Sequence, residues 1–105
     1  MLNPIFAFLF AMDKKTEEFY IRLKEELDNS NTWPAEYLYK FIVPSENHKI
    51  AQVEAAFNQM GAVIKTTQSK NGNFTSISVN VTMNSAQQVI DKYLEVSTIE
   101  GIISL

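Results

Sequence analysis

The chain contains no cysteine, a single histidine and a single arginine among its 105 residues. Without cysteine it forms no disulfide framework, no thiolate metal site and no cysteine nucleophile. His48 alone cannot build a histidine-rich metal site, and in the first turn of an expected helix it is more often solvent-exposed than catalytic. The three glycines form neither a Walker loop nor a Rossmann fingerprint. We therefore expect a protein that is not an enzyme and has no cofactor.

An excess of positive charge is also absent, because nine Lys and Arg oppose 12 Asp and Glu for a net charge of −3. Non-specific nucleic-acid binding relies on clustered basic groups, so this balance argues against it. The carboxylates gather mainly in residues 13–28 at i, i+4 distances from lysines, which is typical of a solvated helix face. Hydrophobic residues make up 46%, and the length fits a single folded domain.

The N-terminal residues 1–12 form an apolar extension that differs from the rest of the chain. The extension is far shorter than the ~20 residues needed to span a bilayer, and it lacks the basic n-region of a signal peptide. Met12-Asp13-Lys14-Lys15 is typical of the start of a soluble protein, so we interpret Met12 as a candidate true start and the preceding residues as mis-assigned. A membrane-surface anchor and a flap over an apolar surface are the alternatives. We expect a cytoplasmic protein without a membrane partner.

Hydrophobic periodicity predicts an amphipathic helix within residues 13–31, followed by a domain over residues 36–105. Phe19, Tyr20, Leu23 and Leu27 lie on one side of this helix. Period-two alternation and turn residues then predict six further elements: a strand over 36–43, a helix over 45–60, strands over 62–69 and 74–83, a helix from 86 and a terminal strand over 99–105.

Local signals mark where these elements begin and end. Ser45 is a candidate N-cap, and Asn71-Gly72 predicts a type I′ hairpin turn. Ser85 and Gln88 have the spacing of a capping box. Gly101 is expected to weaken the last strand or to mark a bulge.

The order of elements predicts the α+β class: a ferredoxin-like βαββαβ sandwich with a four-stranded antiparallel sheet, preceded by the extra N-terminal helix. Two helices would cover one face of the sheet and leave the other open. The open face would carry the candidate interaction surface, which comprises Leu38, Lys40, Ile42, Phe74, Ser76, Ser78 and Asn80. We expect the apolar side chains of this face to be shielded from solvent, either by another subunit or by the N-terminal helix.

Aromatic residues raise the alternative of single-stranded RNA binding on the open face, as in RRM domains. Only Phe74 lies where the RRM pattern requires several aromatic residues. Trp33, Tyr37 and Tyr39 form the nearest aromatic cluster. We assign Tyr37 and Tyr39 to the core-facing row and Trp33 to an edge, with a stacking surface as the alternative.

The strand Tyr37-Leu38-Tyr39-Lys40-Phe41, the hairpin from Ser69 to Val79 and the ending Ile99 to Leu105 resemble the YbeD-like family of small bacterial proteins. This family is labelled as a domain of unknown function, and the resemblance covers about residues 36–105. It implies a ferredoxin-like fold similar to that of the ACT domains, which sense amino acids, and it implies no catalytic residues. ACT domains usually place a glycine in the turn after the first strand, where this chain has Val43-Pro44-Ser45-Glu46-Asn47.

These observations predict a non-enzymatic domain with a regulatory or protein-interaction role. It would bind a protein partner or self-associate through the open face. The alternative from another class is an ACT-like sensor of a small molecule such as an amino acid.

Overall fold

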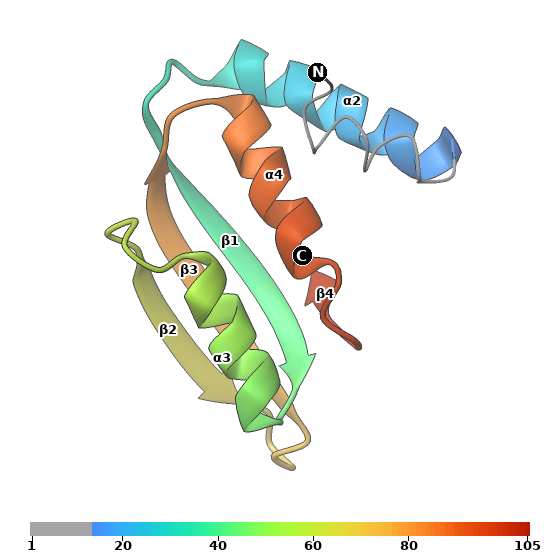
Figure 1. Cartoon of the computed structure of the whole chain (residues 1–105), viewed down its shortest axis with the longest axis vertical. Helices are drawn as coiled ribbons and strands as arrows, with labels where there is room; N and C mark the ends of the chain where they lie inside the picture. The colour runs from blue at the N-terminus through green and yellow to red at the C-terminus, as the bar shows by residue number, and fades with distance from the viewer. Residues whose placement is uncertain (1–13) are drawn as a thin grey trace.

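The computed structural model describes residues 14–105, so the interpretation of residues 1–12 lies outside the described part of the chain. The described residues form three helices and four strands, and Figure 1 shows their arrangement. In chain order these are α2 (Lys14–Ser30), β1 (Ala35–Pro44), α3 (Asn47–Ala56), β2 (Val63–Gln68), β3 (Phe74–Met83), α4 (Ala86–Val96) and β4 (Ile103–Ser104). The predicted α+β class is confirmed.

The four strands form one antiparallel sheet in the order β2-β3-β1-β4. Its centre is the β1–β3 pair, which runs from Ala35 opposite Met83 to Pro44 opposite Phe74. Alternation in both strands separates a buried row from an exposed row, because successive side chains of a strand point to opposite faces. The predicted buried row of β3 is confirmed, since Thr75, Ile77, Val79, Val81 and Met83 are all buried.

The core lies between the sheet and the two helices α3 and α4, which cover the same face (Figure 1). Tyr39 and Phe41 of β1 contact Phe57 and Tyr93, with ring centroids 4.9 to 6.2 Å apart. Edge-to-face and tilted contacts of this kind add to the stabilisation that comes from burying the rings. The predicted buried face of α4 is confirmed: Ala86, Val89, Ile90, Tyr93 and Leu94 are buried.

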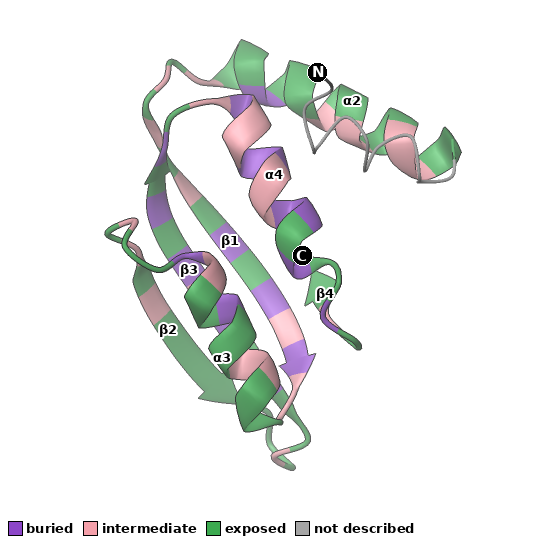
Figure 2. Cartoon of the chain, in the orientation of Figure 1, coloured by how far each residue is buried: buried purple, intermediate pink, exposed green. Residues whose placement is uncertain are grey.

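Helix α2 packs against α4, on the side of α4 that is remote from α3 (Figure 1). Leu27 is buried, and Tyr20 and Leu23 contact the core, whereas Phe19 is 58% exposed. Figure 2 shows that most of α2 remains exposed. The expectation that this helix could cover the open sheet face is therefore wrong. Its apolar side extends the helical layer instead.

The predicted limits of the second helix are also wrong. The helix starts at Asn47 with Glu46 as N-cap, because Ser45 is held beside the loop before β3: its N–H donates to the Asn73 carbonyl at 3.0 Å. The Ser45 hydroxyl instead bonds Thr75 Oγ1 at 2.8 Å. The helix ends at Ala56 rather than Met60: Phe57 is the C-cap and has the non-helical angles φ −107 and ψ 13.

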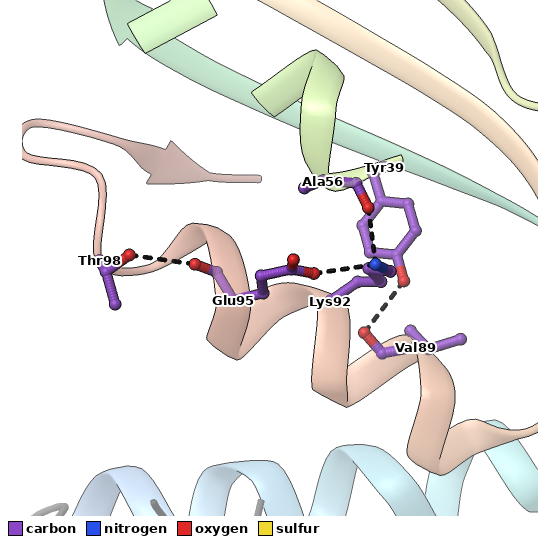
Figure 3. Close-up of polar contacts among 6 residues, drawn as sticks. All are labelled: Tyr39, Ala56, Val89, Lys92, Glu95 and Thr98. Carbon is purple, nitrogen blue, oxygen red and sulfur yellow. Dashed lines mark hydrogen bonds and ion pairs between the residues drawn. The ribbon is translucent and has the colours of Figure 1, made fainter. Parts of the chain in front are cut away.

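The ammonium group of Lys92 caps the C-terminal end of α3. Its Nζ donates to the Ala56 carbonyl at 2.6 Å and contacts the Glu95 carboxylate at 2.8 Å (Figure 3). A cation is favourable there because the last carbonyls of a helix lack intrahelical partners and carry partial negative charge. This contact joins the two helices that cover the sheet.

The β2–β3 connection is a five-residue loop rather than the predicted two-residue type I′ turn. Gly72 has φ +78, but Asn71 lacks the positive φ that a type I′ turn requires. The Gly72 N–H donates to the Ser69 carbonyl at 2.9 Å, and Asn71 Oδ1 accepts from the Asn73 N–H at 3.1 Å. The asparagine thus stabilises the loop by an Asx-type hydrogen bond instead of by its backbone conformation.

At the other end of β3 the Ser85 cap is confirmed, since its hydroxyl accepts from the Gln88 N–H at 3.0 Å. The Gln88 side chain reaches back to the N–H of Asn84 rather than to that of Ser85. The predicted strand over residues 99–105 shortens to Ile103–Ser104, because Ile99 to Ile102 form a turn closed by a 3.2 Å hydrogen bond, with Gly101 at φ +83.

Candidate functional site: the open sheet face

The face of the sheet opposite α3 and α4 carries the candidate interaction residues. Strand register places Leu38 opposite Asn80, Lys40 opposite Ser78 and Ile42 opposite Ser76. Directly paired residues point to the same face of a sheet, so these side chains form three adjacent rows. Phe74 lies at the end of this face, opposite Pro44. We define the open face as these seven candidate residues plus Val63, Lys65 and Ile103, whose positions follow below.

Apolar side chains on the open face are exposed to solvent. Leu38 is 51% exposed and Phe74 is 47% exposed. Two further residues extend the surface: Val63 lies opposite Asn80 and is 59% exposed, and Ile103 lies opposite Ile42 and is 51% exposed. Clusters of exposed large apolar residues mark interaction sites more often than scattered single ones do. The seven-residue candidate set missed both residues. The alternation of the hairpin could have revealed Val63, whereas Ile103 depends on the pairing of a two-residue strand.

Two lysines lie in the middle of the open face. Lys40 and Lys65 both lie opposite Ser78, on its two sides. Neither forms an ion pair within residues 14–105, where the ion pairs join Lys49 to Glu46 and Lys92 to Glu95. Both lysines are exposed. The surface thus offers two cations, with the Ser78 hydroxyl between them and apolar residues on either side.

The aromatic cluster belongs largely to the core, as predicted. Tyr39 is fully buried and its hydroxyl donates to the Val89 carbonyl at 2.9 Å (Figure 3). Burial raises the pKa of Tyr39 well above its ordinary value. Tyr37 is half-buried on the same side of β1, and Trp33 Nε1 donates to Asp28 at 3.1 Å. Among the residues of the open face, the stacking of RNA bases would therefore depend on the aromatic ring of Phe74.

The remaining polar candidates are dispersed. His48 is exposed in the first turn of α3, as expected. Across residues 14–105, no three His, Cys, Asp or Glu side chains are grouped so that they could hold a metal ion. Hydrogen bonding to Lys49 lowers the pKa of Glu46. That pair lies at the start of α3, away from the open face. The chemistry that the open face offers is ionic, hydrogen-bonding and apolar contact.

None of the helices described, from α2 onward, combines the length and apolar character needed to cross a bilayer. The fold and the exposed face together define a small α+β domain with one covered and one open sheet face. Residues 28–105 match the model of the family described as "Protein of unknown function (DUF493)", and the chain belongs to this family. The match begins in the last turn of α2 and includes each of the four strands. No curated protein and no solved structure matches the chain significantly.

Proposed function

We propose that this chain is a cytoplasmic, bacterial YbeD-like protein without catalytic activity, and that it acts as a small regulatory subunit by binding a protein partner. We further propose that its domain is of the ferredoxin-like βαββαβ type. The element order from β1 to β4 and the sheet order β2-β3-β1-β4 support this fold assignment. The fold alone carries no function, so the proposed role depends on the open face.

The observation that carries the proposal is the exposed apolar surface of Leu38, Val63, Phe74 and Ile103 on one face of the sheet. Burying such side chains stabilises a complex by about 25 cal/mol per Å² of apolar surface, before the cost of association is subtracted. Lys40 and Lys65 lie between the apolar residues. A partner that fits this surface presents apolar side chains flanking one or two carboxylates, so that charge complementarity sets its orientation.

The test compares two apolar-to-acidic variants in affinity purification from the native cell. Leu38→Asp places a carboxylate in the open face, whereas Ile21→Asp makes the same kind of change at a 47% exposed position on α2. We expect wild type and Ile21→Asp to retain a stoichiometric partner and Leu38→Asp to lose it. Equal melting temperatures of the two variants would show that both fold.

Self-association is measured in parallel by sedimentation of the purified proteins. A dimer of wild type that Leu38→Asp dissociates identifies a second copy of the chain as the occupant of the open face. Retention of the partner by Leu38→Asp would contradict the proposal. Lys40→Glu adds a second readout, because reversing a charge opposite a carboxylate slows association and changes its salt dependence.

The ACT-like alternative places an amino acid at the turn between β1 and α3. In that turn the Ser45 N–H donates to the Asn73 carbonyl at 3.0 Å, and the Glu46 N–H donates to the Pro44 carbonyl at 2.7 Å. These backbone donors already have acceptors, which disfavours a ligand there. A thermal-shift screen over amino acids separates the two functions, since a ligand bound only by the native state raises the melting temperature. Filter binding to mixed single strands at low salt tests the RNA alternative.

A further inference from the structure

A pocket lies on the other side of the sheet from the open face, where α2 approaches the end of the chain. Its walls are Phe19, Tyr20 and Leu23 of α2, Tyr37 of β1, Tyr93 of α4 and residues 104–105. We call it the tyrosine pocket. Its volume is about 270 Å³. An apolar cavity of ~150 Å³ holds a benzene molecule, so the tyrosine pocket has room for a substituted ring.

Three tyrosines and Ser104 supply the polar side chains of the tyrosine pocket, and two of these tyrosines form a pair. The hydroxyl oxygens of Tyr37 and Tyr93 lie 2.6 Å apart and share a hydrogen bond. A phenol carries one hydrogen and can also accept. Whichever hydroxyl donates within the pair, the hydrogen of the other is left to donate elsewhere. The pair therefore has one hydroxyl hydrogen that can be donated to an acceptor in the pocket.

Within residues 14–105, no Lys, Arg, Asp or Glu side chain lines the tyrosine pocket. Burial raises the pKa of Tyr93 and of Tyr20, so both phenols keep their protons at neutral pH. An anionic ligand would lose hydration there without gaining an opposite charge. The lining instead matches a molecule that is largely apolar and uncharged.

We propose that the tyrosine pocket binds a small neutral molecule with a ring or compact apolar body and one hydrogen-bond acceptor, which accepts from the Tyr37–Tyr93 hydroxyl pair. Few, well-placed polar groups in an apolar lining are the usual composition of a small-molecule site. Three of the lining side chains belong to α2, so the ligand contacts both the helix and the sheet. Binding is thereby coupled to the docking of α2. The proposal is independent of a partner on the open face.

The test compares acetophenone, a neutral ring with a hydrogen-bond acceptor, with benzoate, its charged counterpart. Binding of each to the full chain is measured by NMR chemical-shift titration. We expect saturable shifts at pocket residues with acetophenone and none with benzoate. Slower hydrogen exchange in α2 when acetophenone is bound would report the coupling. Tyr37→Phe combined with Tyr93→Phe removes both hydroxyls, and loss of the one neutral hydrogen bond to the ligand should weaken binding roughly three- to tenfold.

Leu23→Trp fills the pocket and should abolish binding, whereas Ile21→Ala on the exposed side of α2 should leave it unchanged. Leu38→Asp on the open face should also bind acetophenone normally, which separates this proposal from the proposed function. Equal binding of benzoate, unsaturable shifts or unaltered binding by Leu23→Trp would overturn it. Binding that appears only after removal of residues 1–12 would overturn it too, because the pocket would then serve the chain's own extension.

Discussion

Tyr39 joins the sheet to the helical layer through a single side chain. It is fully buried, and its ring lies 4.9 Å from the rings of Phe57 and Tyr93, measured between centroids. Its hydroxyl donates to the Val89 carbonyl at 2.9 Å (Figure 3). A buried phenol needs such a partner, because an unpaired buried hydroxyl is costly. The alternation of β1 predicts the burial of this residue but not its hydrogen-bond partner, which belongs to another element.

Tyr39→Phe should therefore destabilise the protein while leaving its structure intact. The ring keeps its packing, and the lost hydrogen bond is worth about 1 kcal/mol. Urea unfolding of wild type and variant measures the difference. Thr82→Ser, at an exposed position of β3, is the control and should change the free energy of unfolding by less than about 0.5 kcal/mol. A stability equal to that of wild type would contradict the hydrogen bond to Val89.

Tyr39 and Tyr93 also predict a pH dependence of stability. Burial raises the pKa of both phenols well above the ordinary value of 10.0. The folded chain keeps these protons while the unfolded chain releases them near pH 10, so their contribution to stability is complete below pH 10 and falls above it. Each such phenol lowers the free energy of unfolding by about 1.4 kcal/mol per pH unit in that range.

Unfolding in urea between pH 8 and pH 11 measures this effect. Tyr39→Phe removes one of the two phenols and should give a shallower decline than wild type above pH 10. Parallel declines of wild type and Tyr39→Phe would show that Tyr39 does not retain its proton in the folded chain.

At the scale of elements, the agreement between sequence and structure depends on whether the deciding contacts are local. The limits of β3 match the prediction because ten residues alternate without interruption, and Ser85 caps α4 through its own neighbours. Ser45 fails as a cap because hydrogen bonds to Asn73 and Thr75 hold it beside the start of β3. The last strand shortens for a similar reason, since the turn before it packs against β1. Contacts distant in sequence decided both outcomes.

Gly101 and Gly72 offer a matched test of that turn. Both have positive φ, at +83 and +78, but a Cβ on Gly101 would lie 2.9 Å from Cγ of Pro44, whereas a Cβ on Gly72 meets nothing within 4 Å. Gly72→Ala should lower the free energy of unfolding by about 1 kcal/mol, from the unfavourable backbone conformation alone. Gly101→Ala should lower the free energy of unfolding by more, because the turn must also move away from Pro44. The melting temperatures of both variants check this order. Equal losses would show that the turn does not pack against Pro44.

At the scale of the whole molecule, the candidate site divides into a predictable and an unpredictable part. The open-face rows of β1 and β3 follow from alternation in two long strands, so Leu38 and Ser78 are placed correctly. The position of α2 cannot be predicted from the sequence. An apolar stripe on a helix indicates that this side packs against something, but it does not identify the element it packs against. The tyrosine pocket was missed for this reason: it forms only once α2, β1, α4 and the chain end meet.

Removal of residues 1–31 tests how far the sheet domain depends on α2. The innermost core, including Tyr39, Val53 and Val79 at 0% exposure, lies entirely within residues 36–105, so we expect the shortened chain to fold. It loses the burial of Leu27, which is 8% exposed, and uncovers the tyrosine pocket. A fully buried leucine contributes about 2 kcal/mol, and a loss of that size lowers the melting temperature of a domain this small by roughly 8–16 °C.

Circular dichroism and thermal unfolding of the shortened chain provide the measurement, and Leu27→Ala in the full chain provides an independent one. The cavity that this variant leaves should destabilise it by about 2 kcal/mol or more, while Glu26→Ala at the neighbouring exposed position should have little effect. The two experiments are linked: if α2 packs through Leu27, both must lower the melting temperature. A shortened chain as stable as wild type would mean that α2 does not dock on α4 in solution, and the tyrosine pocket would lose its outer wall.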